Sequence, residues 1–524
     1  MRAGEPAARF FAAPGGGAAG RQIEQFSMKR LWRQKLGGTS PHSRARRAAT
    51  FGARATFERS PGPRHAENGP PVPARSRILL TLAVVASSAA GAPAASAAWT
   101  APQTIVADRA ASGVGGAGNR HGSEAFVWKV TSGRVIHAGG LTAAASWVRA
   151  RVRLPDGRRG RVQTISSTRG VVATPQIGVD EAGNVTAVWT QAGRHLAIMA
   201  AFRPHGGRFG APAEIGRSQH FNDARPALAG GRFGDAVVAW NEGRSVQVVR
   251  RGPPACTARR ARACFSAPIA LRRGSDQAVA IGPLGSAYVV WAAEVRTGAD
   301  VHTRLRMTVL RRSGRRLGQE HFLSASGDAG QPSLAVLRDG TALVAWRASL
   351  PAGGEQNDPA PIVAVASTPD AVAGAPQTVS AGRGELPQLR VGAQGEAVLA
   401  WDGFDPTPGS PDGPRISAAV RPAGAAAFGP ATTLSPAGVA AGFASLAVDA
   451  AGSAYVVYSA AAPSASGPVA LSHVRPPGGA FGAPIALAPG FSGLTVLAAG
   501  ARVTAVSGAG SGGAGRTLVS DWTP

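Results

Sequence analysis

From about residue 98 onward, short apolar runs alternate with turns that contain glycine. A glycine stands six positions before an aromatic or apolar residue eight times, at steps of 48 to 61 residues. The eight pairs are Gly122/Trp128, Gly183/Trp189, Gly234/Trp240, Gly285/Trp291, Gly340/Trp346, Gly395/Trp401, Gly452/Tyr458 and Gly500/Val506. A tight turn at the glycine followed by a buried β-strand explains this spacing. The pattern therefore predicts a repeated β-hairpin.

Three further segments recur around that strand. An apolar run, often opened by proline, precedes the turn, as in Pro332–Val336 and Pro387–Val391. After the aromatic residue comes Ile198–Pro204, which is echoed by Ile416–Pro422, and then a segment such as Phe209–Ile215. Each unit thus contains four short strands, which we call a, b, c and d in chain order. Four-stranded units at this period are typical of β-propeller blades.

The two ends of the repeat region complement each other. The last unit has its strand a around Leu494–Ala498, its b at Val503–Val506 and its c at Arg516–Asp521, but no strand d follows. The segment Trp99–Val106 matches the strand d of the preceding unit, Phe481–Leu487. One blade built from both termini closes the ring and leaves no open sheet edge. We therefore predict an all-β propeller closed by its N- and C-terminal strands.

Eight blades are expected by count. Seven is the alternative if the first unit folds irregularly, because no clear strand a stands between Asp108 and His121. Over residues 98–524 the pattern resembles secreted bacterial β-propeller repeat proteins of the sialidase-like or WD-repeat-like kind. A sialidase-like activity would imply an arginine triad, a tyrosine nucleophile and Ser-x-Asp-x-Gly-x-Thr-Trp boxes. The sequence contains no such box, and Tyr288, Tyr455 and Tyr458 all fall in predicted b strands.

A targeting segment precedes the repeats. Arg75 and Arg77 are followed by the apolar run Ile78–Ala86 and by the small residues Ala95-Ser-Ala97. These are the three parts of a secretory signal peptide with its cleavage site. The apolar run is too short for a stable membrane span. We therefore expect a secreted protein, cleaved near Ala97, with no membrane span in the mature chain.

The residues before this signal form a basic segment. Residues 1–71 are rich in Arg, Gly and Pro without periodicity, so we expect them to be disordered. Export machinery reads a signal peptide at the N-terminus, so Val72 is the favoured translation start. It would give a signal peptide of residues 72–97 and leave 1–71 upstream of the protein. Met28 and Met1 are the rival starts.

Charge and cysteine content narrow the function classes. The formal net charge is +27, although only 16% of residues are charged. The arginines are scattered, whereas nucleic-acid footprints cluster on one face with aromatic residues among them, so we do not expect nucleic acid as a partner. Cys256 and Cys264 are separated by seven residues between strands c and d, which predicts a local disulfide in an exported protein. The ten histidines are scattered, and we expect no metal site and no cofactor.

Acidic residues recur just before strand a in four units. They are Asp223, Asp276, Asp328 and Glu385. In a propeller the d–a and b–c loops share one face, so these carboxylates are predicted to surround one mouth of the central channel and to bind a ligand. Acids in the a–b turns, such as Asp180 and Asp449, are expected to be structural because turns favour Asp. Trp147 and Trp522 lie outside the tryptophan register and are candidates for surface contacts.

The leading functional hypothesis is an exported, non-catalytic binding or scaffold module that acts as a monomer. Its expected partner is an extracellular glycan, a cell-wall polymer or a protein. No catalytic residue is assigned, since no paired carboxylates, nucleophile elbow or metalloprotease motif stands out. The first alternative is a sialidase-like or other carbohydrate-active enzyme. The second is a polyanion-binding surface protein, which the net positive charge would favour.

Overall fold

A computed structural model describes most of residues 98–523. Its gaps are residues 107, 109–110, 174, 220, 222–224, 244, 253–261, 263, 299, 314–315, 326–327, 349–359, 369–371, 381, 405–413, 462–467, 490 and 510–515. Cys256 and Asp223 lie outside the described residues. The described part is all β, with almost no helix, and contains no helix long and apolar enough to cross a membrane.

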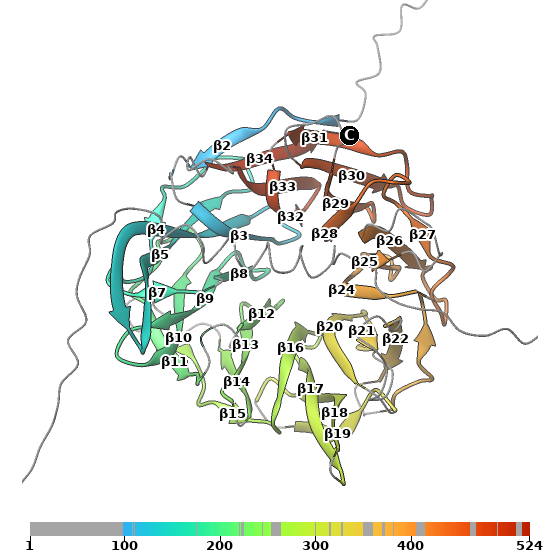
Figure 1. The fold of residues 1–524 in the computed structure, drawn as a ribbon, viewed down its shortest axis with the longest axis horizontal. Coiled ribbons are helices and arrows are strands. Elements are labelled where there is room, and N and C mark those ends of the chain that lie inside the picture. The colour runs from blue at the N-terminus through green and yellow to red at the C-terminus, as the bar shows by residue number, and fades with distance from the viewer. Residues whose placement is uncertain are drawn as a thin grey trace, which may run out of the picture. The chain divides into compact units, whose positions relative to one another are not determined.

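The strands form eight antiparallel sheets that follow one another around a ring (Figure 1). Blade 1 is β3 (Ala111–Gly118), β4 (Glu124–Ala138), β5 (Leu141–Arg153) and β6 (Gln163–Thr164). Blade 2 is β7 (Val171–Val172), β8 (Gln176–Val179), β9 (Val185–Ala192), β10 (Leu196–Arg203) and β11 (Ala213–Arg217). Blade 3 is β12 (Ala227–Gly230), β13 (Ala236–Asn241), β14 (Val246–Arg251) and β15 (Ile269–Ala270). Blade 4 is β16 (Gly274–Ile281), β17 (Ala287–Thr297), β18 (Asp300–Leu310) and β19 (Arg316–Phe322).

The second half of the ring repeats this plan. Blade 5 is β20 (Ala329–Val336), β21 (Ala342–Ala348), β22 (Ile362–Ser367) and β23 (Gln377–Thr378). Blade 6 is β24 (Gly384–Val391), β25 (Ala397–Phe404), β26 (Pro414–Arg421) and β27 (Thr432–Thr433). Blade 7 is β28 (Ala441–Val448), β29 (Ala454–Ala460), β30 (Val469–Arg475) and β31 (Ile485–Pro489). Blade 8 is β32 (Phe491–Ala499), β33 (Arg502–Ala509), β34 (Arg516–Thr523) and, from the N-terminal end, β1 (Ala98–Trp99) and β2 (Gln103–Val106).

The predicted ring closure is confirmed. β1 and β2 pair antiparallel with β34, with Ala98 opposite Thr523 and Gln103 opposite Val519. The eight-blade count is confirmed too, because β3 supplies the strand a of the first unit. Trp522 is a correction: it is buried in blade 8, where its ring meets Trp99 edge-on at 5.5 Å. Trp522 therefore packs at the closure and is not a surface contact.

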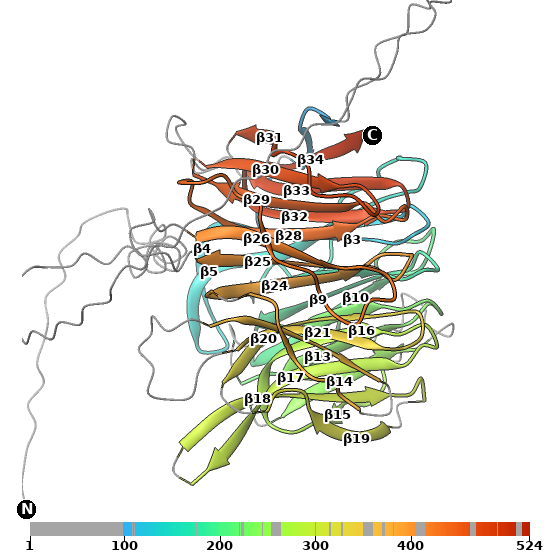
Figure 2. The ribbon, with the colours of Figure 1, turned by 90° about the vertical axis from the view of Figure 1, so that its right-hand side faces the viewer.

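The glycine turns and the aromatic register also behave as predicted. All eight register glycines have a positive φ, between 60° and 94°, which a residue with a Cβ adopts only at a cost. The register residues on strands b are all buried: Trp128, Trp189, Trp240, Trp291, Trp346, Trp401, Tyr458 and Val506. In each blade, the buried side chains of strand b thus pack against the adjacent blades. The side view in Figure 2 shows the β17–β18 hairpin projecting from this stack.

Buried ion pairs link successive blades. Arg251 on β14 of blade 3 reaches back to Asp180, in the a–b turn of blade 2, at 2.6 Å, and both side chains are almost fully buried. Arg475 of blade 7 pairs in the same way with Glu396 of blade 6 at 3.1 Å. At the closure, Arg153 of blade 1 donates two hydrogen bonds, of 2.7 and 2.8 Å, to the Asp521 carboxylate of blade 8. Asp180 and Glu396 therefore link neighbouring blades, and Asp180 also accepts a 2.9 Å hydrogen bond from the Asn184 N–H within its own turn, which is the structural role expected for it.

The predicted disulfide stays a prediction, because Cys256 lies outside the described residues. Cys264 is buried in the apolar cluster between blades 2 and 3, beside Phe265 and Ile215.

Removing one partner of a buried ion pair should destabilise the ring. Asp180→Asn leaves the Arg251 guanidinium buried without a counter-charge, and we expect a loss of about 3–5 kcal/mol in the free energy of unfolding. Denaturant titration of the purified protein measures this loss. Asp156→Asn, which breaks the exposed pair of Asp156 with Arg158, is the control and should leave the transition unchanged. Equal transitions for both variants would contradict the structural role of Asp180.

Candidate functional site

The inner strands of five blades share an irregularity at one position. In each, one residue in the first half of strand a has a left-handed backbone, with φ between 49° and 62°. These residues are Gly113, Asp276, Gln331, Leu386 and Phe443. Each directly follows a residue paired with strand b, and the register shifts there. The feature is therefore a β-bulge repeated around the ring.

Four of these bulge residues are not glycine, and their left-handed backbone is therefore energetically unfavourable. A left-handed conformation costs an ordinary residue about 1–2 kcal/mol, whereas glycine adopts it freely. Blade 1 forms the same bulge with Gly113, so the bulge itself needs no side chain. Strain of this kind persists where the surrounding structure imposes it, and it concentrates at functional sites. We call Asp276, Gln331, Leu386 and Phe443 the bulge arc.

Hydrogen bonds tie the bulge arc together across three blade boundaries. The Gln331 backbone N–H donates to the Asp276 carboxylate at 3.2 Å, and the Leu386 N–H donates to the Gln331 side-chain oxygen at 2.8 Å. At the next boundary the Phe443 N–H donates to Asp402 Oδ2 at 2.8 Å. Each blade therefore presents an acceptor to the strained residue of the next one, and these bonds offset part of the strain.

The bulge arc lies on inner strands of the ring and is at least partly exposed to solvent. Its members lie on β16, β20, β24 and β28, the consecutive inner strands of blades 4 to 7 (Figure 1). Asp276 is exposed, and Leu386 and Phe443 keep 42% and 51% of their surface accessible. Four successive blades thus present a carboxylate, a half-buried amide and two apolar side chains at the same position of strand a. Such a mixture of apolar area and a few placed polar groups is typical of ligand sites.

The four carboxylates predicted from sequence lie in different settings. Asp276 is a member of the bulge arc, and Asp223 falls outside the described residues. Asp328, between β19 and β20, accepts a 2.7 Å hydrogen bond from the Thr303 N–H and one of 3.2 Å from its hydroxyl. Glu385, next to Leu386 on β24, pairs with Arg383 at 3.0 Å. Their role in ligand binding stays a prediction.

Sequence reasoning did not single out Gln331, Leu386 or Phe443. A partial signal existed, because Gln331 and Leu386 each precede the proline that opens a recurring apolar run. An alignment of the units at the register glycine, nine positions further along, places Gln331, Leu386 and Phe443 in the same column as Asp276.

The tyrosines are structural. Tyr288, Tyr455 and Tyr458 are buried, and burial raises the pKa of the Tyr455 and Tyr458 phenols well above the usual range. The Tyr288 hydroxyl donates to the Gly340 carbonyl oxygen of the next blade at 2.7 Å. A buried phenol with a raised pKa is a poor nucleophile near neutral pH. Among the described residues no cluster of three His, Cys, Asp or Glu side chains could hold a metal ion.

Comparisons with known proteins concern the fold alone. No family model and no curated protein matches the sequence. A solved structure of unknown function from Dyadobacter fermentans aligns with 68% of this chain and 96% of its own, at 11% identity and a TM-score of 0.41. A PL25 ulvan lyase aligns with 69% of this chain and 91% of its own, at 10% identity and a TM-score of 0.41. The Cps50 (Swd1) β-propeller domain of Myceliophteria thermophila covers 82% of this chain and aligns over 99% of its own length, at 10% identity and a TM-score of 0.37.

Replacing an exposed bulge residue by glycine should cost almost no stability. Leu386→Gly relieves the left-handed strain, while the more flexible unfolded chain offsets that gain, so the free energy of unfolding should stay within about 1 kcal/mol of the wild-type value. Leu389→Ala, three residues along the same strand and fully buried, is the control and should lose about 2–5 kcal/mol. Denaturant titration compares them. A comparable loss in both variants would show that the Leu386 side chain serves the fold.

Proposed function

We propose that this propeller is an exported, non-catalytic binding module that holds a glycan or cell-wall polymer at the bulge arc. One observation carries the proposal: four consecutive blades place a strained, non-glycine residue at a position where blade 1 uses glycine. The side chains of Leu386 and Phe443 are exposed there, so burial in the core does not account for them. Natural proteins retain such locally unfavourable residues where function needs them.

The chemistry of the bulge arc suits a polyhydroxyl ligand. A sugar offers hydroxyl groups at its edge and C–H groups on its faces. The Asp276 carboxylate accepts hydrogen bonds from hydroxyls, and the Gln331 amide both donates and accepts. Phe443 and Leu386 supply apolar contact area beside them. Asp223 and Asp328, which precede strand a in the sequence, and Glu385, which lies at the start of β24, belong to the same proposed site as flanking acids.

Export is part of the proposal and rests on the signal-peptide pattern of residues 72–97. N-terminal sequencing of the protein recovered from the culture medium should give a chain that begins near Ala98. We also propose that the protein acts as a monomer, because apolar clusters already join each blade to the next within one chain, including blade 8 to blade 1.

A neutral glycan and cell-wall polymer array tests the binding function. The exported protein should retain one or more polymers, and the variant with Leu386→Gly and Phe443→Gly should lose at least tenfold in affinity. Asp276→Asn should lose less, because an amide oxygen still accepts a hydrogen bond. Leu284→Gly removes an exposed leucine from an a–b turn, and this control should bind normally.

Two results would contradict the proposal. The first is unchanged binding by the variant that lacks both Leu386 and Phe443. The second is turnover of aryl glycosides or of a bound polymer, which would favour the carbohydrate-active enzyme instead.

A further inference from the structure

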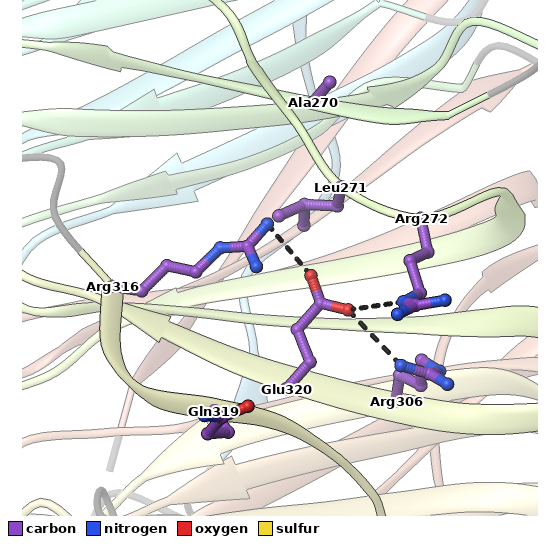
Figure 3. A pocket seen from close by; sticks show the side chains of 7 residues that line it. All are labelled: Ala270, Leu271, Arg272, Arg306, Arg316, Gln319 and Glu320. Carbon is purple, nitrogen blue, oxygen red and sulfur yellow. Dashed lines mark hydrogen bonds and ion pairs between the residues drawn. The ribbon is translucent and has the colours of Figure 1, made fainter.

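A pocket of about 600 Å³ lies at the outer rim, where blade 3 meets blade 4 (Figure 3). Blade 3 contributes Ala270 at the end of β15 and Leu271 and Arg272 just after it. Blade 4 contributes Arg306 from β18 and Arg316, Gln319 and Glu320 from β19. Neither the bulge arc nor the predicted acidic residues take part. A volume of this size is within the range of small-ligand sites.

Three arginines converge on one carboxylate inside this pocket. Glu320 lies at the centre of Figure 3, with Arg316 3.0 Å from Oε1 and with Arg306 and Arg272 3.3 and 3.4 Å from Oε2. Glu320 and Arg306 are largely buried, whereas Arg272 and Arg316 keep 70% and 46% of their side-chain surface exposed. The floor of the pocket is thus formed by the buried pair Glu320 and Arg306, and two accessible guanidinium groups, those of Arg272 and Arg316, lie beside it.

A bulge in β19 builds this arrangement. β18 and β19 pair at Met307 with His321 and again at Val309 with Leu317, so that residues 318–320 of β19 stand opposite Thr308 alone. Bulges of this kind redirect side chains out of the regular alternation of a strand. Here the bulge carries Gln319 and Glu320 into the pocket. The charged cluster is therefore specified by the geometry of the strand pair.

The cluster has an excess of positive charge. Glu320 neutralises one of the three arginines, which leaves two positive charges in the pocket. Arg304 lies close by, with its guanidinium 3.8 Å from the centre of the Phe322 ring, and Arg306 lies 4.1 Å from the same ring. Burial lowers the pKa of Arg306, the charges of Arg272 and Arg304 lower it further, and Glu320 offsets only part of this effect. A bound anion would relieve this crowding of like charges.

We propose that this pocket binds an oxyanion group, a sulfate or a carboxylate, of a sugar-sized ligand. Planar guanidinium groups donate paired N–H bonds that match the oxygens of such groups. Glu320 orients the arginines through its ion pairs, and the exposed N–H groups of Arg272 and Arg316 donate hydrogen bonds to the anion. The pocket is larger than one inorganic anion needs, so the ligand extends beyond the charged group. This site is independent of the bulge arc.

Binding to defined probes tests the site. Isothermal titration calorimetry measures the affinity of the exported protein for three probes. They are a sulfated disaccharide, a disaccharide containing a uronic acid, and sodium sulfate. We expect at least one disaccharide to bind at least tenfold more tightly than sodium sulfate, and the preferred disaccharide identifies the oxyanion. Arg272→Gln with Arg316→Gln should weaken that binding at least tenfold. Raising the salt concentration should weaken it in the wild type, because charged contacts are screened.

A matched variant separates this site from general charge attraction. Arg120→Gln with Arg217→Gln also removes two exposed arginines, each paired with one glutamate, and should change the affinity less than twofold. Equal losses in the two double variants would overturn the proposal, as would sodium sulfate binding as tightly as the disaccharides or no binding of any probe. Neutral polymers should still bind the Arg272→Gln/Arg316→Gln variant, so failure here is distinguishable from failure at the bulge arc.

Discussion

Both faces of every sheet in this protein are apolar, and only a closed ring of blades covers both faces of all of them. The buried tryptophans of strands b fill the space between successive sheets. Buried ion pairs such as Asp180 with Arg251 then add a directional link at the same boundaries. A blade without its neighbours would expose both its apolar surface and an uncompensated charge. For that reason the pairing of β34 with β1 and β2, which closes the ring, is as important for stability as the contacts between the other blades.

A ring held in this way can impose strain on its inner strands. The inner strands surround the centre of the ring (Figure 1), and five of them bulge at the same position. The neighbouring blade stabilises the strained position, as when Gln331 accepts the hydrogen bond of the Leu386 N–H. The cost of about 1–2 kcal/mol at a non-glycine residue is small beside the stabilisation of the blade interfaces. A rigid framework with a few strained, exposed side chains is how binding sites are commonly built.

The sequence predicts well whatever repeats locally. The glycine turns, the buried tryptophans and the match between Trp99–Val106 and Phe481–Leu487 depend on short segments, and the structure confirms each. The bulge arc was missed except for Asp276, because a bulge appears only when strand a is paired with strand b. The pocket around Glu320 was missed because it joins Arg272 to residues more than thirty positions away, through an irregularity of β19 that no residue type marks. Acidic residues are easy to recognise in a basic sequence, but the sequence does not show which arginines pair with them.

The net charge of +27 therefore says little about where an anion binds. Exposed charges more than about 8–10 Å apart are largely screened at physiological ionic strength, so the many scattered arginines act almost independently. What distinguishes Arg272, Arg306 and Arg316 is convergence: one buried carboxylate orients all three and neutralises only one of them. At the bulge arc the local balance is reversed, since Asp276 is an exposed acid there and Glu385 is matched by Arg383. One framework thus carries two proposed sites of different chemistry, and what separates them is the local arrangement of charged groups and not the total charge.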